Sequence, residues 1–372
     1  MTKIKFFDLK IVNQKYKKKL LKSFKKFLEK GNFFLGPEVR AIEKKIAKEN
    51  QSSYCIFLSS GSSALYLALK AAGIKDGDEV ITTPLSWIMT SNAIKACGAK
   101  PVFVDVGFDF NIDANLIEEK ITKKTKAIVP VHYAGLMCDM SLIQKVSKRY
   151  NLKIIEDSAQ AFGAKFNGMK SGNFSDIGAF STNPMKPFSG FGESGFIVTK
   201  SKRYYKKILR LRHAGVLLDK NKKNTNLCYE ISLNHKIDNL NASLLIESLK
   251  EFPKKIKKIQ KLSNFYTKHL TSKVKIQETP INKHHARYVF PIIANKRDEL
   301  RIYLQKKGIE TKIFNIPLIP RAPAYKKDYK GLKFRVAEEL AKKNLVLPCH
   351  EKLSFKNIKY ITKCINQFYE NY

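Results

Sequence analysis

Residues 152–195 read LKIIEDSAQAFGAKFNGMKSGNFSDIGAFSTNPMKPFSGFGESG, and this stretch decides the fold that we expect. The apolar run LKIIE predicts a buried strand that ends at Asp157, and IGAFS predicts a second strand that leads to a turn containing Lys186. The residues between them are rich in glycine, serine and polar side chains, as in loops that line a site. An acid and a lysine that each follow a strand end favour a cofactor with a cationic ring and an aldehyde, and we therefore expect pyridoxal phosphate.

The surrounding sequence, from Ser53 to about Leu211, alternates short apolar runs with helical segments. The expected strands are YCIFLSS, EVITT, PVFVDV, KAIVPVHY, LKIIED, IGAFST and GFIVTK, and the expected helices include SSALYLALKAAG, ANLIEEKI and MSLIQKVSKRY. Uniformly apolar strands separated by helices predict an α/β fold with a mostly parallel sheet that is covered on both faces. Ligands of such sheets bind outside the carboxyl ends of the strands.

A helix over LNASLLIESLKEF is expected to end before Pro253, because proline lacks an N–H group and clashes with the preceding turn. We place a domain boundary there. Residues 15–252 form the expected large α/β domain, and residues 253–372 form a smaller α+β domain on which residues 1–14 pack. The smaller domain contains two expected strands, ARYVFPIIA and IETKIF, and two expected helices, RDELRIYLQKKG and SFKNIKYITKCINQFY.

The chain has 372 residues, which is enough for two domains that each have a hydrophobic core. It contains no apolar run of about 18 residues, so we expect no membrane span, and the N-terminus does not resemble a signal peptide. The six cysteines form no CxxC pair, so we expect free thiols in a cytoplasmic protein and no metal site.

The net charge of +38 suggests a nucleic-acid or membrane-surface partner at first sight. However, lysines are spread along the whole chain, and in residues 14–30 and 254–266 they alternate with apolar residues at helical spacing. These lysines are expected to form the solvated face of amphipathic helices. Since no nucleic-acid motif accompanies the charge, we expect no nucleic-acid partner, although a positive field favours anionic substrates.

Two further segments follow predicted strands. In FLSSGSSALYLAL (57–69), Gly61 and Ser62 stand where a strand turns into a helix, and a helix N-terminus binds phosphate through its free N–H groups. The same residues are also typical of a simple helix cap. Trp87 follows EVITT, where its ring is expected either to stack on a cofactor or to be partly buried in an inter-domain crevice.

Position, and not composition, singles out the remaining candidates. Asp157 can pair with a protonated ring nitrogen, although an acid at a strand end is also a common turn cap. Gln160 can donate a hydrogen bond to an oxygen on the ring. Lys186 lies between two prolines in a lysine-rich chain, and Ser181 on the preceding strand can reach a cofactor phosphate.

Several motifs occur in the order found in one known family, and the sequence resembles the DegT/DnrJ/EryC1/StrS aminotransferases. They are SSGSSAL, PLSW, PVHYAGLMCDM, EDSAQAFGA, FSTNPMK, GFGESG, LNHKIDNLNASLL and LVLPCH. The resemblance extends from Gly36 to the C-terminus. It implies the fold of type I pyridoxal-phosphate transferases, which is similar to that of aspartate aminotransferase.

The resemblance also implies a role for each candidate residue. Lys186 would form the Schiff base with pyridoxal 5′-phosphate and shuttle protons, and Asp157 would hold the pyridine nitrogen. Gln160 would contact the phenolate oxygen, and Trp87 would stack on the ring. The residues implied to take the phosphate are Gly61, Ser62, Ser181 and, across a subunit interface, Asn234.

Such a contribution from Asn234 implies a homodimer with shared active sites. The family's usual Asn-Tyr-Arg is replaced here by Asn234-His235-Lys236, which keeps a cation but loses the bidentate guanidinium. Phe162 stands where a histidine is frequent in the family.

The function expected from this resemblance is the transfer of an amino group, with L-glutamate as donor, to a nucleotide-linked keto sugar. The product would serve the synthesis of a surface polysaccharide such as lipopolysaccharide, or of another glycan. Two alternatives are a pyridoxal-phosphate sugar dehydratase and a non-catalytic, basic binding protein on the same fold. Relatives that are dehydratases carry a histidine in place of the lysine, so Lys186 argues against the first, and the retained Asp157 and Gln160 argue against the second.

Overall fold

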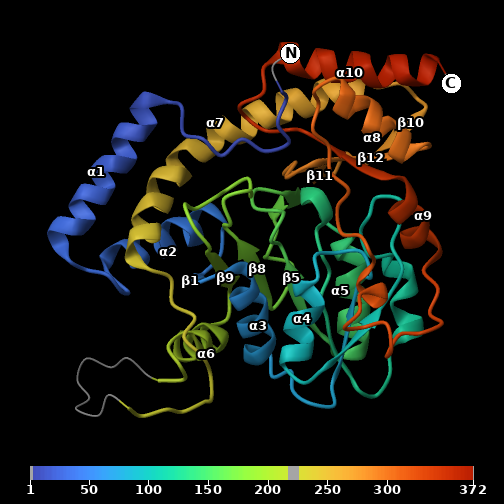
Figure 1. Cartoon of the computed structure of the whole chain (residues 1–372). Helices are drawn as coiled ribbons and strands as arrows, with labels where there is room; N and C mark the ends of the chain where they lie inside the picture. Colours follow the sequence, from blue (N-terminus) through green and yellow to red (C-terminus); the bar gives the residue numbers. More distant parts are fainter. Residues whose placement is uncertain (1–2, 217–225, 372) are drawn as a thin grey trace.

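The computed structural model describes residues 3–216 and 226–371, and its largest sheet has seven strands (Figure 1). In spatial order its strands are β1 (Tyr54–Leu58), β9 (Gly195–Thr199), β8 (Ile177–Ser181), β5 (Lys153–Asp157), β4 (Thr125–Ile128), β2 (Glu79–Thr82) and β3 (Lys100–Phe103). The strands from β8 to β3 pair in parallel, whereas β9 is antiparallel to both of its neighbours. The predicted α/β fold with a mostly parallel sheet is therefore confirmed.

Helices cover both faces of this sheet, which explains why its strands are apolar throughout. Along β1, Ile56 and Leu58 pack in one core cluster, whereas Cys55 and Phe57 pack in another, because successive side chains of a strand point to opposite faces. The first cluster includes residues of α3 (Gly61–Ala71), α4 (Met89–Ala96) and α6 (Lys202–Arg212), and the second includes residues of α2 (Pro37–Glu49). A third cluster packs α5 (Met140–Tyr150) against β2, β4 and β5.

The C-terminal part of the chain forms a second core around a small antiparallel sheet of β10 (Val274–Ile276), β12 (Phe290–Ala294) and β13 (Asn344–Leu347). Three further helices lie in this region, α8 (Arg297–Lys306), α9 (Arg335–Lys343) and α10 (Phe355–Glu370). Near the other end of the chain, Ile4 pairs with Ile309 and packs in the same core, while Met1 and Thr2 lie outside the described residues. A short sheet of β6 (Lys165–Phe166), β7 (Met169–Lys170) and β11 (Lys283–His284) links the two parts of the chain.

The prediction that a helix ends before Pro253 is wrong. Helix α7 (Asn239–His269) continues through Pro253 and passes from the region of the large sheet to the C-terminal region (Figure 1). Its first half packs Leu245 and Phe252 into the core beneath α2, and its second half packs Leu262 into the core of the C-terminal region. This burial on both sides offsets the hydrogen bond that proline removes. The domain boundary at 252/253 thus falls inside one helix, and it stays a prediction.

Two other local predictions differ from the structure. ANLIEEKI forms two short 3₁₀ turns, η1 (Ala114–Leu116) and η2 (Glu118–Lys120), instead of an α-helix. IETKIF contains only isolated bridges at Ile309 and Lys312. Neither segment has the long, strongly periodic apolar pattern that makes a local prediction secure.

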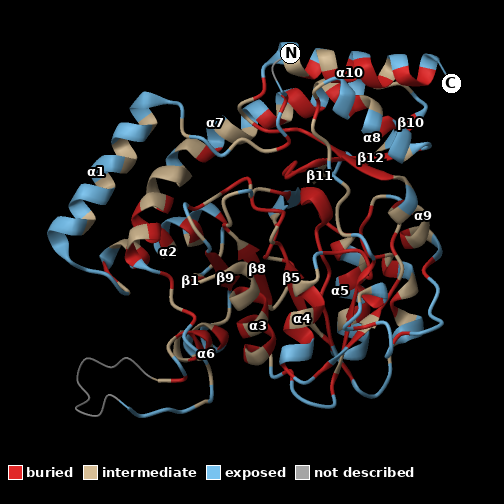
Figure 2. Cartoon of the chain, in the orientation of Figure 1, coloured by how far each residue is buried: buried red, intermediate tan, exposed pale blue. Residues whose placement is uncertain are grey.

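Helix α1 (Gln14–Lys30) has no buried residue and lies at the edge of the molecule (Figures 1 and 2). Apart from Lys19, which is half-buried and pairs with Glu251 of α7, its lysines are exposed as predicted, but Leu21, Phe24 and Leu28 are exposed too. Within residues 3–216 and 226–371, no helix is both long enough and apolar enough to cross a bilayer.

Candidate active site

The candidate residues within the stretch 152–195 meet at one edge of the large sheet. β5 and β8 are parallel neighbours, with Asp157 beside Ala179 in the register. Asp157 and Ser181 are therefore the last residues of adjacent strands, and the chain leaves Ser181 for the turn that carries Lys186. This is the carboxyl edge of the sheet, where α/β proteins of this type bind their ligands.

Asp157 is a buried carboxylate that is 5% exposed. Its Oδ2 accepts a hydrogen bond from Thr90 Oγ1 at 2.8 Å, and its Oδ1 accepts one from the backbone N–H of Ala159 at 3.2 Å. Burial raises the pKa of Asp157, while these hydrogen bonds and the nearby charge of Lys186 act in the opposite direction. Among the described residues Asp157 has no ion-pair partner, so a cationic ring nitrogen would supply the missing countercharge.

Lys186 is held above an aromatic ring that the sequence did not associate with it. Its Nζ lies 4.1 Å from the centroid of the Tyr288 ring, which is a cation–π contact. Its backbone N–H donates to the carbonyl of Asn183 at 2.8 Å, which closes the turn after β8. The side chain of Lys255 on α7 donates to the carbonyl of Lys186 at 3.4 Å. The lysine is thus presented by a turn that is tied to both parts of the chain.

The N-terminus of α3 forms a cradle that fits a phosphate. Ser60 caps the helix by accepting the N–H of Ser63 at 3.0 Å, whereas the N–H groups of Gly61 and Ser62 have no partner in the described part of the chain. Gly61 lies directly against Ser181, because a Cβ added at Gly61 would lie 2.7 Å from Ser181 Cβ. The structure therefore brings together the three predicted phosphate residues of this subunit.

Gln160 has one end of its amide group fixed. Its Oε1 accepts a hydrogen bond from the backbone N–H of Ala134 at 2.8 Å. Its NH₂ group has no partner within residues 3–216 and 226–371, so it is available as a donor to a ligand. This arrangement fits the predicted contact with an oxygen of the cofactor ring.

Trp87 and Asn234 are placed differently from the other candidates. Trp87 is 65% exposed, and its ring has no aromatic partner among the residues that the structure describes. It lies three residues before Thr90, the hydrogen-bond donor to Asp157. Asn234 is exposed, and its backbone forms an isolated bridge with His213. Within a single chain, therefore, neither side chain is enclosed in the site.

Sequence reasoning missed Thr90, Tyr288 and the buried pair of His132 and Glu156. One local feature could have indicated Thr90. It stands about one helical turn after Trp87, and its hydroxyl lies on the side of α4 that faces β5. Tyr288 is about a hundred residues from Lys186 in the sequence, and no local pattern indicates that they meet. His132 lies in PVHYAG, but the sequence does not show that Glu156 is its partner.

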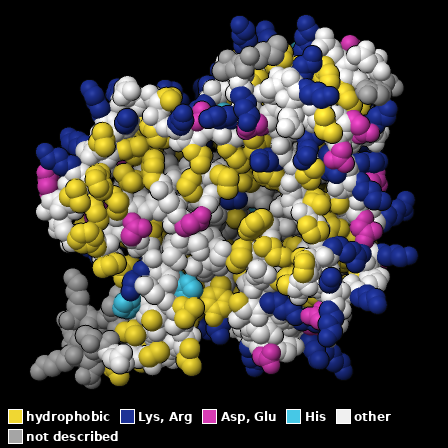
Figure 3. All heavy atoms as spheres, viewed as in Figure 1, with side chains coloured by type: hydrophobic (Ala, Val, Ile, Leu, Met, Phe, Trp, Pro, Cys, Tyr) yellow, Lys and Arg dark blue, Asp and Glu magenta, His cyan; other side chains and the backbone are white. Residues whose placement is uncertain are grey.

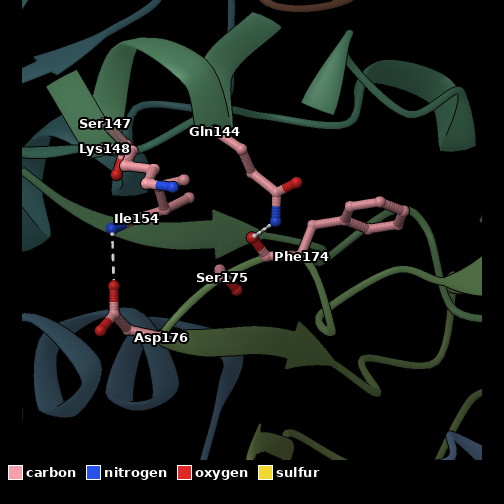
Figure 4. A pocket seen from close by; sticks show the side chains of 7 residues that line it. All are labelled: Gln144, Ser147, Lys148, Ile154, Phe174, Ser175 and Asp176. Atoms are coloured by element: carbon pink, nitrogen blue, oxygen red, sulfur yellow. Dashed lines mark hydrogen bonds between the residues drawn. The ribbon is translucent and has the colours of Figure 1, made fainter. Parts of the chain in front are cut away.

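A separate surface cavity of about 480 Å³ lies at the opposite end of β5 (Figure 4). Here the backbone N–H of Ile154 donates to Asp176 Oδ2, and Gln144 Nε2 donates to the carbonyl of Phe174. These contacts lie at the start of the strand, away from its carboxyl edge. The cavity is therefore distinct from the candidate active site.

Together, the buried carboxylate, the lysine, the amide donor and the open helix N-terminus fit a ligand with a cationic ring, an aldehyde and a phosphate. The described residues contain no group of three or more His, Cys, Asp or Glu side chains that could hold a metal ion.

The sequence was compared with known proteins, and residues 14–366 match the DegT/DnrJ/EryC1/StrS aminotransferase family. Among curated relatives, a "Pleiotropic regulatory protein" of Geobacillus stearothermophilus is 32% identical over 98% of this chain and 98% of its own length. The GDP-perosamine synthase of Escherichia coli O157:H7 is 35% identical, with 92% of each chain covered. The dTDP-3-amino-3,6-dideoxy-alpha-D-galactopyranose transaminase of Aneurinibacillus thermoaerophilus is 32% identical, with 98% of this chain and 99% of that protein covered.

The fold is also similar to solved structures. The crystal structure of NtdA from Bacillus subtilis with bound cofactor PMP superposes with a TM-score of 0.92 and 28% sequence identity. The match covers 100% of this chain and 86% of that one. The family match spans nearly the whole chain, and the fold and the geometry of the site agree with it. The chain belongs to the DegT/DnrJ/EryC1/StrS aminotransferase family.

Proposed function

We propose that this chain is a pyridoxal-phosphate-dependent aminotransferase that transfers an amino group to a nucleotide-linked keto sugar, with L-glutamate as the donor. One observation carries this proposal. Asp157, Lys186 and the N–H groups of Gly61 and Ser62 meet at one sheet edge, and within the described residues the buried Asp157 has no ion-pair partner and these N–H groups have no acceptor. The names of two relatives, a GDP-perosamine synthase and a dTDP-amino-sugar transaminase, support a nucleotide sugar as the acceptor.

Pyridoxal phosphate, when bound, supplies an electron sink and a carbon that carries the amino group between substrates. Asp157 keeps the ring nitrogen protonated, and its buried hydrogen bonds with Thr90 and Ala159 orient the carboxylate for this. The NH₂ group of Gln160 donates to the ring oxygen, while the N–H groups at the start of α3 hold the phosphate. Each group is in place before substrate arrives, which reduces the reorganisation needed during the reaction.

Lys186 moves the proton that is exchanged during amino transfer. With the cofactor held by the residues above, the Nζ of Lys186 would act as the positioned general base and acid that accepts and releases this proton. The ring of Tyr288 holds the ammonium group at the site while it carries this proton. The family resemblance implies that sugar dehydratases have a histidine at this position, so Lys186 favours amino transfer over dehydration.

We also propose a homodimer whose subunits complete each other's sites. Apolar side chains gather on the face shown in Figure 3. The large apolar residues that the chain leaves exposed include Phe33, Phe34, Trp87, Ile231 and Leu233. Burial of such a patch by a second copy would remove a large apolar surface from water. It would also enclose Trp87 and Asn234, which a single chain leaves exposed.

The positive charge supports an anionic substrate rather than a nucleic acid. Lys and Arg side chains are dispersed over the face in Figure 3 and form no single basic stripe on it. We propose that the product is an amino sugar for a surface polysaccharide such as lipopolysaccharide, or for another glycan. All six cysteines are free, and this supports a reducing, cytoplasmic location.

The test is the absorbance spectrum of the purified protein with and without L-glutamate. We expect a visible band that glutamate converts to a band at shorter wavelength, and a second conversion in the reverse direction when a nucleotide keto sugar is added. Lys186→Ala should retain the phosphate and ring contacts but lose turnover. A protein whose spectrum ignores every amino donor, or normal turnover in Lys186→Ala, would contradict the proposal.

A further inference from the structure

A buried pair of side chains next to the proposed cofactor site takes no direct part in the proposed amino transfer. His132 and Glu156 are both fully buried, and His132 Nε2 lies 2.8 Å from Glu156 Oε2. Glu156 immediately precedes Asp157 on β5, so its side chain points to the opposite face of the sheet. The Glu156 side chain therefore faces away from a ligand of Asp157, and both ring nitrogens of His132 are engaged by protein groups, Glu156 and the backbone N–H of Cys138.

The hydrogen bonds identify the protonation of His132. The backbone N–H of Cys138 donates to His132 Nδ1 at 3.2 Å, so Nδ1 carries no proton. The proton is therefore on Nε2, which donates to Glu156. Three more donors satisfy the Glu156 carboxylate at 2.7–2.9 Å, namely Gly172 N, Phe174 N and Ser175 Oγ. The pair is thus fully hydrogen-bonded and holds His132 in one orientation.

The loop of residues 132–135 connects this pair to three parts of the site. The N–H of His132 donates to the carbonyl of Asp157 at 3.2 Å, and the N–H of Ala134 donates to Gln160 Oε1 at 2.8 Å. The carbonyl of Ala134 accepts the N–H of Tyr288 at 2.9 Å. Ala134 has a φ of 55°, which an alanine adopts only when its surroundings hold it there.

We propose that the Glu156–His132 pair is a positioning element of the active site. By fixing loop 132–135, it turns the NH₂ group of Gln160 toward the cofactor and holds the Tyr288 ring under the Lys186 ammonium. Both residues act through others and are therefore positioning residues. The inference rests on the proposed function, since it assigns the pair to the contact that Gln160 makes with the cofactor.

The experiment compares His132→Leu and His132→Gln with the control Leu300→Ala. His132→Gln keeps a donor for Glu156 but loses the acceptor at Nδ1, whereas His132→Leu loses both. Leu300 is fully buried in the core of the C-terminal region, so its truncation destabilises the protein without touching the loop. The first readout is hydrogen exchange of the amides of residues 132–138 in cofactor-free protein. We expect faster exchange there in both His132 variants and no local change in Leu300→Ala.

The second readout is the pH titration of the visible band of the holoenzyme. A misaligned Gln160 stabilises the charge on the ring oxygen less well. We therefore expect the midpoint of the pH titration to move by about half a pH unit in His132→Leu. We expect kcat to fall about tenfold, with a smaller change in KM for the donor. Leu300→Ala should keep the wild-type midpoint.

The inference would be overturned if a folded His132→Leu protein had the hydrogen exchange, titration midpoint and kcat of wild type. It would also be overturned if Leu300→Ala changed these quantities as much as His132→Leu does. If His132→Leu does not fold, the milder His132→Gln carries the same comparison. A wild-type protein that binds no pyridoxal phosphate would instead contradict the proposed function, and the exchange measurement would still test the link between the pair and the loop.

Discussion

The Lys186 ammonium lies 4.1 Å from the centroid of the Tyr288 ring, although the two residues belong to different parts of the chain. Tyr288 is 8% exposed, and its ring stacks on Phe7 near the N-terminus with centroids 6.2 Å apart. The proposed proton carrier therefore rests on a ring that depends on packing between the two parts. Movement of one part relative to the other would change where the Lys186 amine lies.

Replacement of Tyr288 tests this contact. Tyr288→Phe keeps the ring face, so we expect kcat within about threefold of wild type. Tyr288→Leu removes a contact of about 0.5–2 kcal/mol, so we expect kcat to fall by about 2- to 30-fold. Steady-state kinetics at saturating substrates measure both. Equal losses in the two variants would show that the hydroxyl, or packing alone, matters and not the ring face.

Thr90 is expected to set the acid limb of the pH profile. Burial raises the pKa of Asp157, and the hydrogen bond from Thr90 lowers it. Thr90→Val removes that bond, so the pKa of Asp157 should rise further. Because Asp157 must be ionised to pair with the ring nitrogen, the acid limb of kcat/KM should move to higher pH, with about a three- to tenfold loss at acidic pH.

Thr90→Ser retains the hydroxyl and serves as the matched control, with an acid limb close to that of wild type. Titration of kcat/KM from pH 5 to pH 9 distinguishes the variants. An unchanged acid limb in Thr90→Val, or a shift in the opposite direction, would show that Asp157 does not govern it.

The contact between Gly61 and Ser181 makes the phosphate cradle sensitive to one methyl group. In Gly61→Ala, the new Cβ would lie 2.7 Å from Ser181 Cβ, so the start of α3 must shift. We expect the Kd for pyridoxal phosphate to rise by about tenfold or more, as measured by fluorescence titration of cofactor-free protein.

The double variant Gly61→Ala/Ser181→Gly removes the atom that clashes. It should bind the cofactor more tightly than Gly61→Ala alone, even though Ser181→Gly alone loses a hydroxyl near the phosphate. Such non-additivity is expected of residues in contact. Simple addition of the two losses would mean that the Gly61–Ser181 contact does not limit binding.

The sequence predicted the parts of the site that depend on local order. Asp157, Ser181 and Lys186 each stand at or just after an apolar run, and Gly61 begins a helix after one. Apolar runs predict strands, and parallel strands place their carboxyl ends at one edge, so these residues could be brought together without a structure.

Contacts between distant segments were not predictable in this way. Tyr288 and His132 reach the site through packing and hydrogen bonds that join separate segments. Pro253 shows the opposite error, because a strong local signal for a helix end was overridden by burial of α7 in two cores. Local propensity is a weak prior where tertiary packing is extensive.

Asn234 tests whether the sites are shared. If Asn234 serves the partner's site, a dimer of one Lys186→Ala chain and one Asn234→Ala chain contains one complete site and one without either residue. Random mixing makes half of the dimers mixed, so we expect about a quarter of wild-type activity from two nearly inactive variants. Mixing Lys186→Ala with Asp157→Ala is the matched control, because the charges of Lys186 and Asp157 interact within one subunit and every mixed dimer then has a defect in each of its sites. This pair should show no comparable recovery.

Activity is measured after subunit exchange has been verified with differently tagged chains. If the mixture of Lys186→Ala and Asn234→Ala does not recover activity, Asn234 lies in its own subunit's site or outside any site.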